Sequence, residues 1–348
     1  MNLRPTSAGR AESALEERIA AADALLREQV AGGSAESAAL LVQQRAMRYV
    51  RHYGAAAPEQ PFLIASLTKP MTAAAVLRLC DLGELRLADP VTRYLPEFRG
   101  AGREEVALRH LLTHTSGLPD MLPENVALRR RHASIDEFVA GACRASLRFA
   151  PGTRVAYQSM GILLAAAVVE RVSGSALRDF LHEQFFLRLR MADTSLGLGG
   201  RRVEAMVRCQ VSEPPTDWDW NSPYWRDFGA PWGGVHSTVQ DLARFFAQFT
   251  GADSPLRTET LRAMTAVQTS GLNEAWGLGW ARQPGTFGRA CSPLAFGHFG
   301  NTGTIGWHDP EHSLTCLLLT SVPATDSRAG LLGAVSDIIA GDPRPNSP

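Results

Sequence analysis

Apolar side chains near the amino terminus recur at steps of three and four, the spacing of an amphipathic helix that lies on a core. They are Leu15, Ile19, Ala22, Leu26 and Val30. The stretch SAALLVQQRAMRYVRHYG then has two apolar-rich runs around a polar turn, which predicts two short strands. From Ser66 to about Leu82 the chain is rich in Ala, Leu and Met, and Pro70 is tolerated only in a first turn. This segment is predicted to be a helix that begins close to Ser66.

The middle of the chain, from about residue 83 to 200, has a mostly helical pattern. Helices are predicted in TRYLPEF, VALRHLLTHTSG, SIDEFVAGAC, SMGILLAAAVVERVSG and SALRDFLHEQFF. Gly117 and Gly174 follow such patterns, and glycine at this position is typical of a helix end. The stretch from Glu213 to Gly234 gathers tryptophan and tyrosine among Pro, Asp and Asn, which favours a long loop.

The last third of the chain is rich in predicted strands. After a helix in STVQDLARFFAQF, with Ser237 as its expected N-cap, strands are predicted in AWGLGWARQ, AFGHFG, TGTIGWHD and SLTCLLLTSV. The DPEHS turn joins the last two strands as a hairpin, and RAGLLGAVSDIIA closes the chain as a helix. Strands at both ends with helices between them predict one sheet built from both termini and a helical insertion.

The composition is that of an ordinary globular protein. The chain has 348 residues, 45% of them hydrophobic and 20% charged, and this length suggests about two domains. A net charge of zero gives no attraction to nucleic acid or to an anionic membrane. The run from Arg129 to Arg131 is interpreted as a solvated turn or helix end.

The amino terminus and the cysteines bear on location. No segment matches a secretory signal or a membrane span, so the chain as given is expected to stay in the cytoplasm. Five widely spaced cysteines without a Cys-x-x-Cys pair are expected to be free core thiols in a reducing compartment.

Lys69, in the stretch PFLIASLTKP, is the single lysine of the chain, beside 34 arginines. Arginine stays charged in proteins, whereas a buried lysine can lose its proton, so this position is a candidate for proton transfer. Ser66 precedes it by three residues, and at that spacing on a helix the amine reaches the hydroxyl. A helix start also favours negative charge, which helps a serine nucleophile. Taken alone, the pair is equally consistent with an N-cap serine and a surface lysine.

Tyr157, in PGTRVAYQSMG, is the candidate general base. A phenol is a weak base, but a neighbouring ammonium favours the phenolate. Tyr157 is therefore expected to share the serine proton with Lys69. The alternative is a half-buried core tyrosine.

The segment FGHFGNTG is expected to be an edge strand beside the nucleophile. The backbone amides of Ser66 and Asn301 are the predicted oxyanion hole, and Gly300 is expected to let substrate approach the backbone. His298 is expected to contact substrate or to tune Tyr157, with a structural hydrogen bond as the alternative.

Six motifs occur in order over roughly residues 35 to 322: ASLTKP, LLTHTSGLP, PGTRVAYQS, GGVHSTVQDLARF, WGLGW and GHFGNTG. Together they resemble the β-lactamase-related serine hydrolase family, which includes class C β-lactamases, D-alanyl-D-alanine carboxypeptidases and family VIII carboxylesterases. The resemblance implies an α+β fold of the β-lactamase/transpeptidase type, with an antiparallel sheet flanked by helices on both faces. It also implies acyl-enzyme chemistry on Ser66, in a cleft between a sheet domain (1–80 and 230–348) and a helical second domain (81–229).

Two departures from the family pattern bear on the substrate. The family usually has Tyr-x-Asn, but here Ser159 stands in place of the Asn, and the edge strand lacks the Lys-Thr-Gly that holds the carboxylate of a penicillin. A largely neutral histidine followed by phenylalanine should hold an anion less well, so both changes favour a neutral ester over a β-lactam. The predicted substrate-binding residues are Ser159, Trp232, His298, Phe299 and Gly300.

We therefore expect a serine hydrolase with carboxylesterase activity on small or medium neutral esters, acting without a metal or cofactor. Acyl transfer in biosynthesis, a β-lactamase or D-aminopeptidase-type amidase, and a non-catalytic binding member of the fold are the alternatives. His110 and His114 have zinc-site spacing, but Leu111 stands where such a site needs glutamate. The expected partner is a small ester or amide, with neither nucleic acid nor membrane involved, and the oligomeric state stays open.

Overall fold

The computed structural model describes residues 7–211, 217–324 and 330–341, and its main feature is a five-stranded antiparallel sheet. The strand order is β2-β1-β8-β7-β6, so the sheet is built from both ends of the chain, as predicted. β7 and β8 form the expected hairpin. The strands are β1 (Ser37–Gln44), β2 (Met47–Gly54), β6 (Phe296–Gly300), β7 (Thr304–Asp309) and β8 (Leu314–Thr320).

Helices cover both faces of this sheet. Along β1, Leu40 and Val42 pack toward α1 (Ser7–Ala31) and α11 (Leu331–Ala340), whereas Leu41 belongs to the core on the opposite face. That opposite face carries α9 (Val239–Ala247), which contacts β8 and β1. The alternation follows from the two-residue period of a strand. The predicted α+β class, with helices on both faces of an antiparallel sheet, is confirmed.

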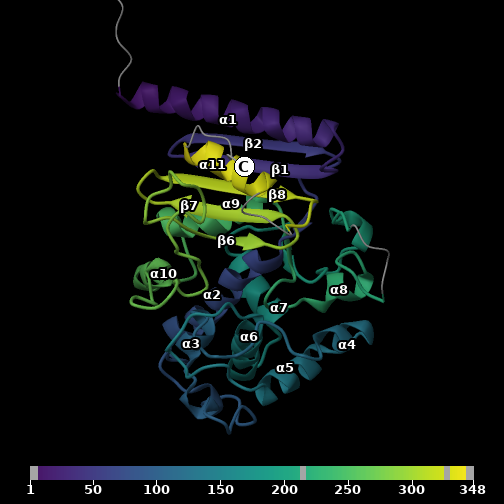
Figure 1. Cartoon of the computed structure of the whole chain (residues 1–348), viewed down its shortest axis with the longest axis vertical. Helices are drawn as coiled ribbons and strands as arrows, with labels where there is room; N and C mark the ends of the chain where they lie inside the picture. The colour runs from purple at the N-terminus through teal and green to yellow at the C-terminus, as the bar shows by residue number, and fades with distance from the viewer. Residues whose placement is uncertain (1–6, 212–216, 325–329, 342–348) are drawn as a thin grey trace, which may run out of the picture.

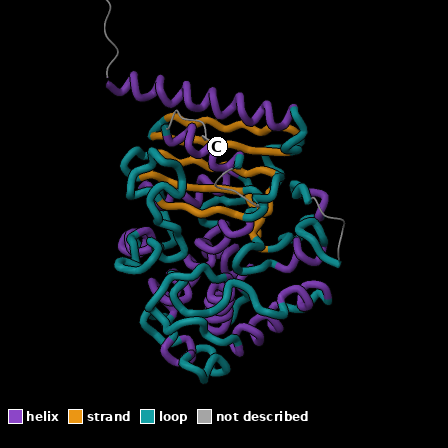
Figure 2. Tube along the Cα trace, viewed as in Figure 1, coloured by secondary structure: helices purple, strands orange, loops and turns teal. Residues whose placement is uncertain are grey.

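The remaining helices gather at one end of the sheet (Figures 1 and 2). α6 lies at their centre and packs against α2, α3 and α5. One continuous apolar cluster joins these helices to the sheet, and the division at residues 80 and 230 stays a prediction. The helices are α2 (Thr68–Asp81), α3 (Leu108–Leu112), α4 (Asn125–Arg130), α5 (Ile135–Arg144), α6 (Ser159–Ser173), α7 (Leu177–Leu181), α8 (Pro223–Phe228) and α10 (Thr258–Thr265).

A second, three-stranded sheet joins the two parts of the molecule. Its order is β3-β5-β4, with β3 at Phe62–Leu63, β5 at Val235–Ser237 and β4 at Ser195–Leu196. The pairing continues past β3, where the Ile64 amide donates to the Val235 carbonyl at 2.9 Å. This small sheet therefore fixes the turn after β3 against the segment that precedes β5.

Two predicted elements differ in the structure because glycine and proline turn the chain. The segment AWGLGWARQ forms only isolated bridges: Gly279 has a φ of +84° and the chain turns closely over the start of α2. The segment TRYLPEF yields a single 3-10 turn at Val91–Arg93, ahead of Pro96. The five cysteines are free, as predicted, with Cys80 and Cys291 half-buried rather than in the core.

Three predicted element boundaries differ from those in the structure. Gly117 caps no helix, since α3 ends at Leu112; its φ of +84° instead allows the backbone to pass the Phe149 carbonyl. Ser237 lies in β5, and Thr238 caps α9 by accepting from the Asp241 amide at 3.2 Å. In the described part of the predicted loop from Glu213 to Gly234, helix α8 begins with Ser222 as its N-cap and proline at its first position. Residues 212–216 lie outside the described part.

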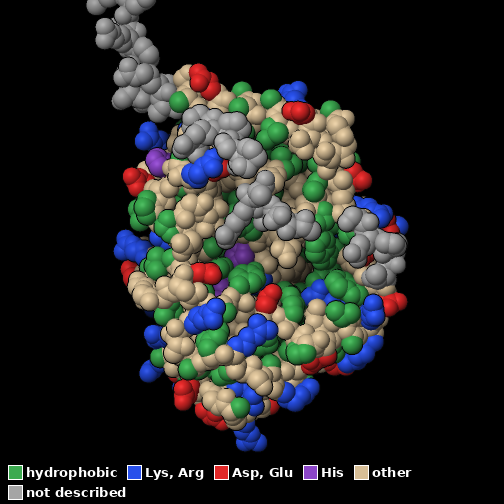
Figure 3. All heavy atoms as spheres, viewed as in Figure 1, with side chains coloured by type: hydrophobic (Ala, Val, Ile, Leu, Met, Phe, Trp, Pro, Cys, Tyr) green, Lys and Arg blue, Asp and Glu red, His purple; other side chains and the backbone are tan. Residues whose placement is uncertain are grey.

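The surface agrees with a composition in which basic and acidic residues are equal in number. On the face shown in Figure 3, basic and acidic side chains are interspersed rather than gathered by sign. Within the described ranges, no single helix combines the length and apolarity needed to cross a bilayer; one bent pair, α6 with Leu177–Phe186, passes by length and composition alone.

Gly300 ends β6 where that strand meets the turn before α2. A methyl group there would overlap the Ile64 carbonyl and the Thr304 hydroxyl, which donates to the same carbonyl at 2.9 Å. The room that glycine leaves at this position is therefore filled by protein, and this corrects the expectation that it admits substrate.

We predict that Gly300→Ala destabilises the protein by about 1–3 kcal/mol, because backbone and hydroxyl atoms cannot move aside as a side-chain end can. Gly306→Ala on β7 is the control, since its methyl would meet the ends of Leu317, Leu67 and Phe246 at 3.0–3.2 Å. Urea unfolding of both variants checks this. Equal losses in the two variants would contradict the steric account.

Candidate active site

Ser66 lies in a tight turn between β3 and α2. The turn is a 3-10 helix at Ala65–Leu67, and Ala65 before it has a φ of +44°. A non-glycine residue in this region of backbone space is uncommon and often marks a functional turn. Because α2 begins at Thr68, Lys69 stands in its first turn and its side chain reaches back to Ser66.

The Lys69 amine is fully buried and contacts the Ser66 hydroxyl. Nζ donates to Ser66 Oγ at 2.8 Å and to the Trp232 carbonyl at 2.9 Å, and the side chain is 0% exposed. Burial lowers the pKa of Lys69 to about 7, while the Asp120 carboxylate acts in the opposite direction. A large fraction of this amine is therefore neutral near pH 7. Trp232 supplies its backbone carbonyl to this contact, a role that the sequence did not reveal.

Tyr157 completes a group of three around the serine. The Lys69 Nζ lies 4.8 Å from the centre of its ring, and Tyr157 borders the same pocket as Ser66. Burial raises the pKa of Tyr157 above its usual value, and the neighbouring Ser66 hydroxyl lowers it less. The phenol is therefore protonated at neutral pH, contrary to the expected phenolate.

Two histidines and a tryptophan lie against Tyr157. The ring centres of His114 and His298 are 4.7 and 5.9 Å from that of Tyr157, and Trp276 packs edge-on to His114 at 4.3 Å. Burial lowers the pKa of His298 to about 3 and that of His114 well below its usual value. Both rings are neutral at pH 7. His298 lies against Tyr157, as one of its expected roles requires, and its Nδ1 pairs with the Phe299 carbonyl at 2.7 Å, which is the kind of structural hydrogen bond given as the alternative.

Asp120 is a functional candidate that the sequence reasoning missed. Its Oδ1 accepts from the amide and the hydroxyl of Ser159 at 2.8 and 2.7 Å. Its negative charge raises the pKa values of Lys69 and Tyr157. The one sequence signal was its place directly after LLTHTSGLP. Ser159 stands where the family usually has asparagine, and it holds the Asp120 carboxylate beside the site. A carboxylate therefore lies where the family pattern would place an amide.

A pocket of about 110 Å³ opens beside Ser66. It brings together several of the predicted site residues. These are Ser66, Tyr157, Ser159, Trp232 and Asn301, with Lys69 buried behind them. The other walls come from Leu63 on the sheet side and from Asp120, Arg129 and Trp225 on the helical side.

The edge-strand residues are placed differently from the prediction. Phe299 alternates with His298 and Gly300 along β6, so it points to the opposite face and stacks on Phe287 with ring centres 5.5 Å apart. His298 is buried against Tyr157, and Gly300 packs on the Ile64 carbonyl. The structure therefore does not bring these three predicted substrate-binding residues to the pocket wall.

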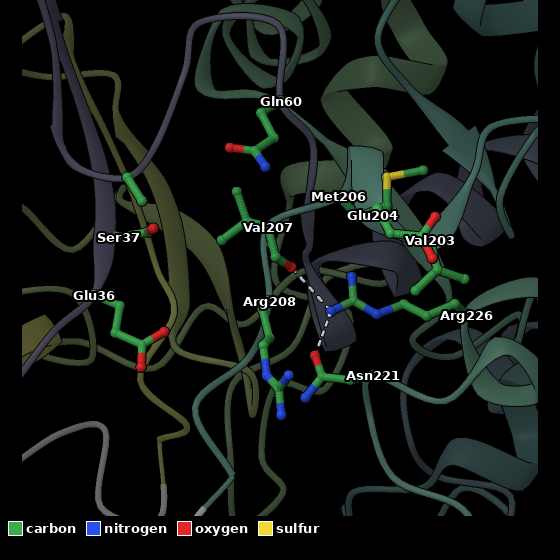
Figure 4. Close-up of a pocket in the computed structure, with 11 residues that line it drawn as sticks. Glu36, Ser37, Gln60, Val203, Glu204, Met206, Val207, Arg208, Asn221 and Arg226 are labelled. Atoms are coloured by element: carbon green, nitrogen blue, oxygen red, sulfur yellow. Dashed lines mark hydrogen bonds between the residues drawn. The ribbon is translucent and has the colours of Figure 1, made fainter.

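A larger pocket, of about 440 Å³, lies elsewhere on the molecule (Figure 4). Its lining includes Glu36, Ser37, Arg208, Asn221 and Arg226. Among its described lining residues, Ser37 is the single serine, and neither lysine nor histidine accompanies it. The pairing of a hydroxyl with a titratable amine belongs to the smaller pocket at Ser66.

Comparison with known proteins agrees with this geometry. The sequence profile of the β-lactamase family matches residues 22–337. The chain belongs to the β-lactamase family. It is a serine hydrolase by family, and the predicted resemblance is confirmed.

Individual relatives differ in how much of the chain they match. Esterase EstB of Burkholderia gladioli is 44% identical over 131 residues, which is 33% of each chain. The D-alanyl-D-alanine-carboxypeptidase/endopeptidase AmpH of Escherichia coli K12 is 27% identical over 72% of this chain and 70% of its own. Among solved structures, EstCE1, a hydrolase with promiscuous acyltransferase activity, superposes with a TM-score of 0.78 at 19% identity, covering 95% of this chain and 100% of its own. The low identity of that structure supports the fold alone.

We predict that the Lys69 amine titrates near pH 7 and that Asp120→Asn moves its midpoint to lower pH. Removing the carboxylate removes the charge that favours the ammonium, so the proton is lost more easily. With a single lysine in the chain, protein labelled with ¹³C at lysine Cε gives one side-chain signal to follow by NMR.

Ser159→Ala is the matched control, because it removes a hydrogen bond to Asp120 but keeps the charge. A midpoint near 10 in the wild type would show that burial does not govern this amine, and an upward shift in Asp120→Asn would show that the carboxylate does not stabilise the ammonium.

Proposed function

We propose that this protein hydrolyses carboxylic esters through an acyl-enzyme on Ser66. The observation that carries the proposal is the 2.8 Å contact between the Lys69 amine and the Ser66 hydroxyl. The neutral amine takes the proton from Ser66 Oγ as that oxygen bonds to the ester carbonyl carbon. The tetrahedral intermediate then expels the alcohol. Water attacks the acyl-serine in the second half, which releases the acid and regenerates the hydroxyl.

Lys69 and Tyr157 have pKa values shifted in opposite directions, and this difference assigns a separate role in proton transfer to each. Lys69, with a pKa lowered to about 7, is the better acceptor, whereas Tyr157, with a raised pKa, is a phenol that donates. We therefore assign the base to Lys69. Tyr157, which lines the pocket beside Ser66, passes a proton toward the leaving oxygen. This revises the sequence-based assignment of Tyr157 as the base.

The oxyanion is assigned to the backbone amides of Ser66 and Asn301. Both residues border the pocket, which supports a carbonyl oxygen being held between the turn before α2 and the end of β6. Such amides stabilise negative charge that develops during attack without reorganising.

An ester that is neutral around the scissile bond is the substrate class best supported. The edge strand offers no lysine, and His298 stays neutral at pH 7, so a carboxylate beside the reacting carbonyl would find no cation there. The partial match to an esterase supports ester hydrolysis as the reaction. The similarity to EstCE1 makes acyl transfer to an alcohol the second candidate, since both reactions share the acyl-enzyme.

We predict that wild-type protein hydrolyses p-nitrophenyl butyrate, that Ser66→Ala lowers kcat/KM by about 10³-fold or more, and that a chromogenic cephalosporin is turned over poorly. Spectrophotometric rates and intact mass of the acylated protein provide the measurement. Thermal unfolding of Ser66→Ala shows that the variant is folded. Ester turnover that persists in Ser66→Ala would end the proposal.

We also predict that Lys69→Arg loses nearly as much activity as Ser66→Ala although it keeps the positive charge. Arginine cannot give up its proton at neutral pH, so the serine is left without an acceptor. The Lys69→Met variant is compared with it, because it removes the charge while keeping a long side chain. Full activity in Lys69→Arg would mean that the residue acts only through its charge.

A further inference from the structure

Arg129 on α4 is a buried cation in the wall of the Ser66 pocket. It is 7% exposed and lines the same pocket as Ser66, Tyr157 and Asn301. The sequence reading of Arg129 to Arg131 as a solvated run is therefore wrong for its first member. Arg131 does lie at the surface, where it pairs with Glu137.

The described contacts of Arg129 leave its charge without an anionic partner. Its Cζ lies 4.2 Å from the ring centre of Trp225 and 4.5 Å from that of Trp218, and Nη2 reaches the Met121 sulfur at 3.6 Å. Nε is buried and has no hydrogen-bond partner among the described residues. Two indoles and a thioether hold a guanidinium in place, but they do not replace the oxygen acceptors that its N–H groups lose on burial.

Arg226 shows how this chain holds a buried arginine by protein oxygens at one nitrogen, although its Nε and Nη1 have no partner among the described residues. Its Nη2 donates to the Val207 carbonyl at 2.9 Å and to Asn221 Oδ1 at 2.8 Å, in the larger pocket (Figure 4). Arg129 has no such oxygen within the described chain, and it faces the cavity in which Ser66 is attacked. Among the described residues no oxygen pairs with Arg129, so the pocket is the place from which an oxygen acceptor can reach it.

We propose that Arg129 binds a carboxylate at the far end of the substrate's acyl chain, so that the preferred esters are half-esters of short dicarboxylic acids. This rests on the proposed ester hydrolysis. A guanidinium presents paired N–H groups that match a carboxylate. The pocket is small, about 110 Å³ against about 440 Å³ for the larger pocket, which suits a short arm and not a long acyl chain.

The charge balance of the pocket is compatible with such an anion. Asp120 attracts Arg129 from a distance, but among the described contacts neither an ion pair nor a hydrogen bond joins them, and Asp120 Oδ1 accepts from the amide and hydroxyl of Ser159. The pKa of Arg129 is lowered to about 10 by burial, so the guanidinium stays charged at neutral pH. The proposal also refines the expectation of a neutral ester. Neutrality is required around the scissile carbonyl, at β6, whereas the cation is supplied from α4 on the helical side.

The test compares monomethyl succinate with methyl succinamate, which has the same size but carries an amide in place of the carboxylate. Proton release in a pH-stat gives kcat/KM for each ester. We expect wild type to prefer the anionic ester by tenfold or more, and Arg129→Met to lose this preference, since hydrogen bonds to charged groups carry discrimination of this size. Methionine keeps a long side chain against the two indoles. Arg131→Gln, which removes an exposed charge from the same run, should leave both rates unchanged.

A binding experiment with a variant that cannot hydrolyse the ester tests this inference separately from the proposed hydrolysis. Ser66→Ala cannot turn the ester over, and Trp218 and Trp225 beside Arg129 report binding through their fluorescence. Monomethyl succinate should give a saturable change that methyl succinamate gives only at tenfold or higher concentration. Adding Arg129→Met, or Arg129→Lys where the methionine variant does not fold, should weaken the anion's binding.

The outcomes point in different directions. Equal kcat/KM for the two esters in wild type, with a ratio unchanged in Arg129→Met, would overturn the inference and leave the hydrolase standing. If wild type turns over neither these two esters nor p-nitrophenyl butyrate, the proposed function fails, and the fluorescence titration then decides the role of Arg129 by itself. A fluorescence change of equal size and midpoint for both esters would count against it.

Discussion

The desolvation of one amine is the constraint on which the site depends. Lys69 is held by two neutral oxygens, Ser66 Oγ and the Trp232 carbonyl, and no ion pair compensates its burial in the described structure. The free energy of keeping a charge there is high, so the pKa falls to about 7 and the group becomes a base that works at neutral pH. Arginine cannot respond to burial in this way. That difference explains why a chain that uses arginine at every other basic position has a lysine here.

The scaffold around this amine is built from segments far apart in the sequence. The Thr68 hydroxyl accepts from the Val235 amide at 3.0 Å, and the Ile64 amide donates to the Val235 carbonyl. These bonds join the start of α2 to the strand that follows Trp232. They therefore fix the position of the Trp232 carbonyl, to which the Lys69 amine donates. On the other side, the Thr304 hydroxyl donates to the Ile64 carbonyl, which holds the edge of the large sheet to the same turn. Both sheets thus converge on the residues around Ser66, and the geometry of the amine follows from the backbone.

Local patterns in the sequence correctly predicted the helices and strands that follow from periodicity. They also predicted the contact between Ser66 and Lys69, because helical spacing alone brings those side chains together. The predictions were wrong where tertiary packing determines the path of the chain or the burial of a side chain. The apolar alternation in AWGLGWARQ is that of a strand, yet Gly279 turns the chain over α2. Arg129 and Arg131 look alike in the sequence, and only the tryptophans of a segment about 90 residues further along bury the first. Asp120 could not be recognised because its importance comes from the amide and hydroxyl of Ser159, which no local spacing relates to it.

The charges of the pocket connect the chemistry to the inferred substrate. His114 and His298 are neutral at pH 7, so the positive charge near Ser66 comes from Arg129 and from Lys69 once it has accepted the serine proton. Asp120 stabilises the Lys69 ammonium and also attracts Arg129, so one carboxylate acts on both cations. A substrate carboxylate on Arg129 would neutralise the second cation and act in the same direction as Asp120. Binding of the acyl arm would then make Lys69 a stronger base at the moment when attack requires it, so that recognition at one end of the pocket assists proton transfer at the other.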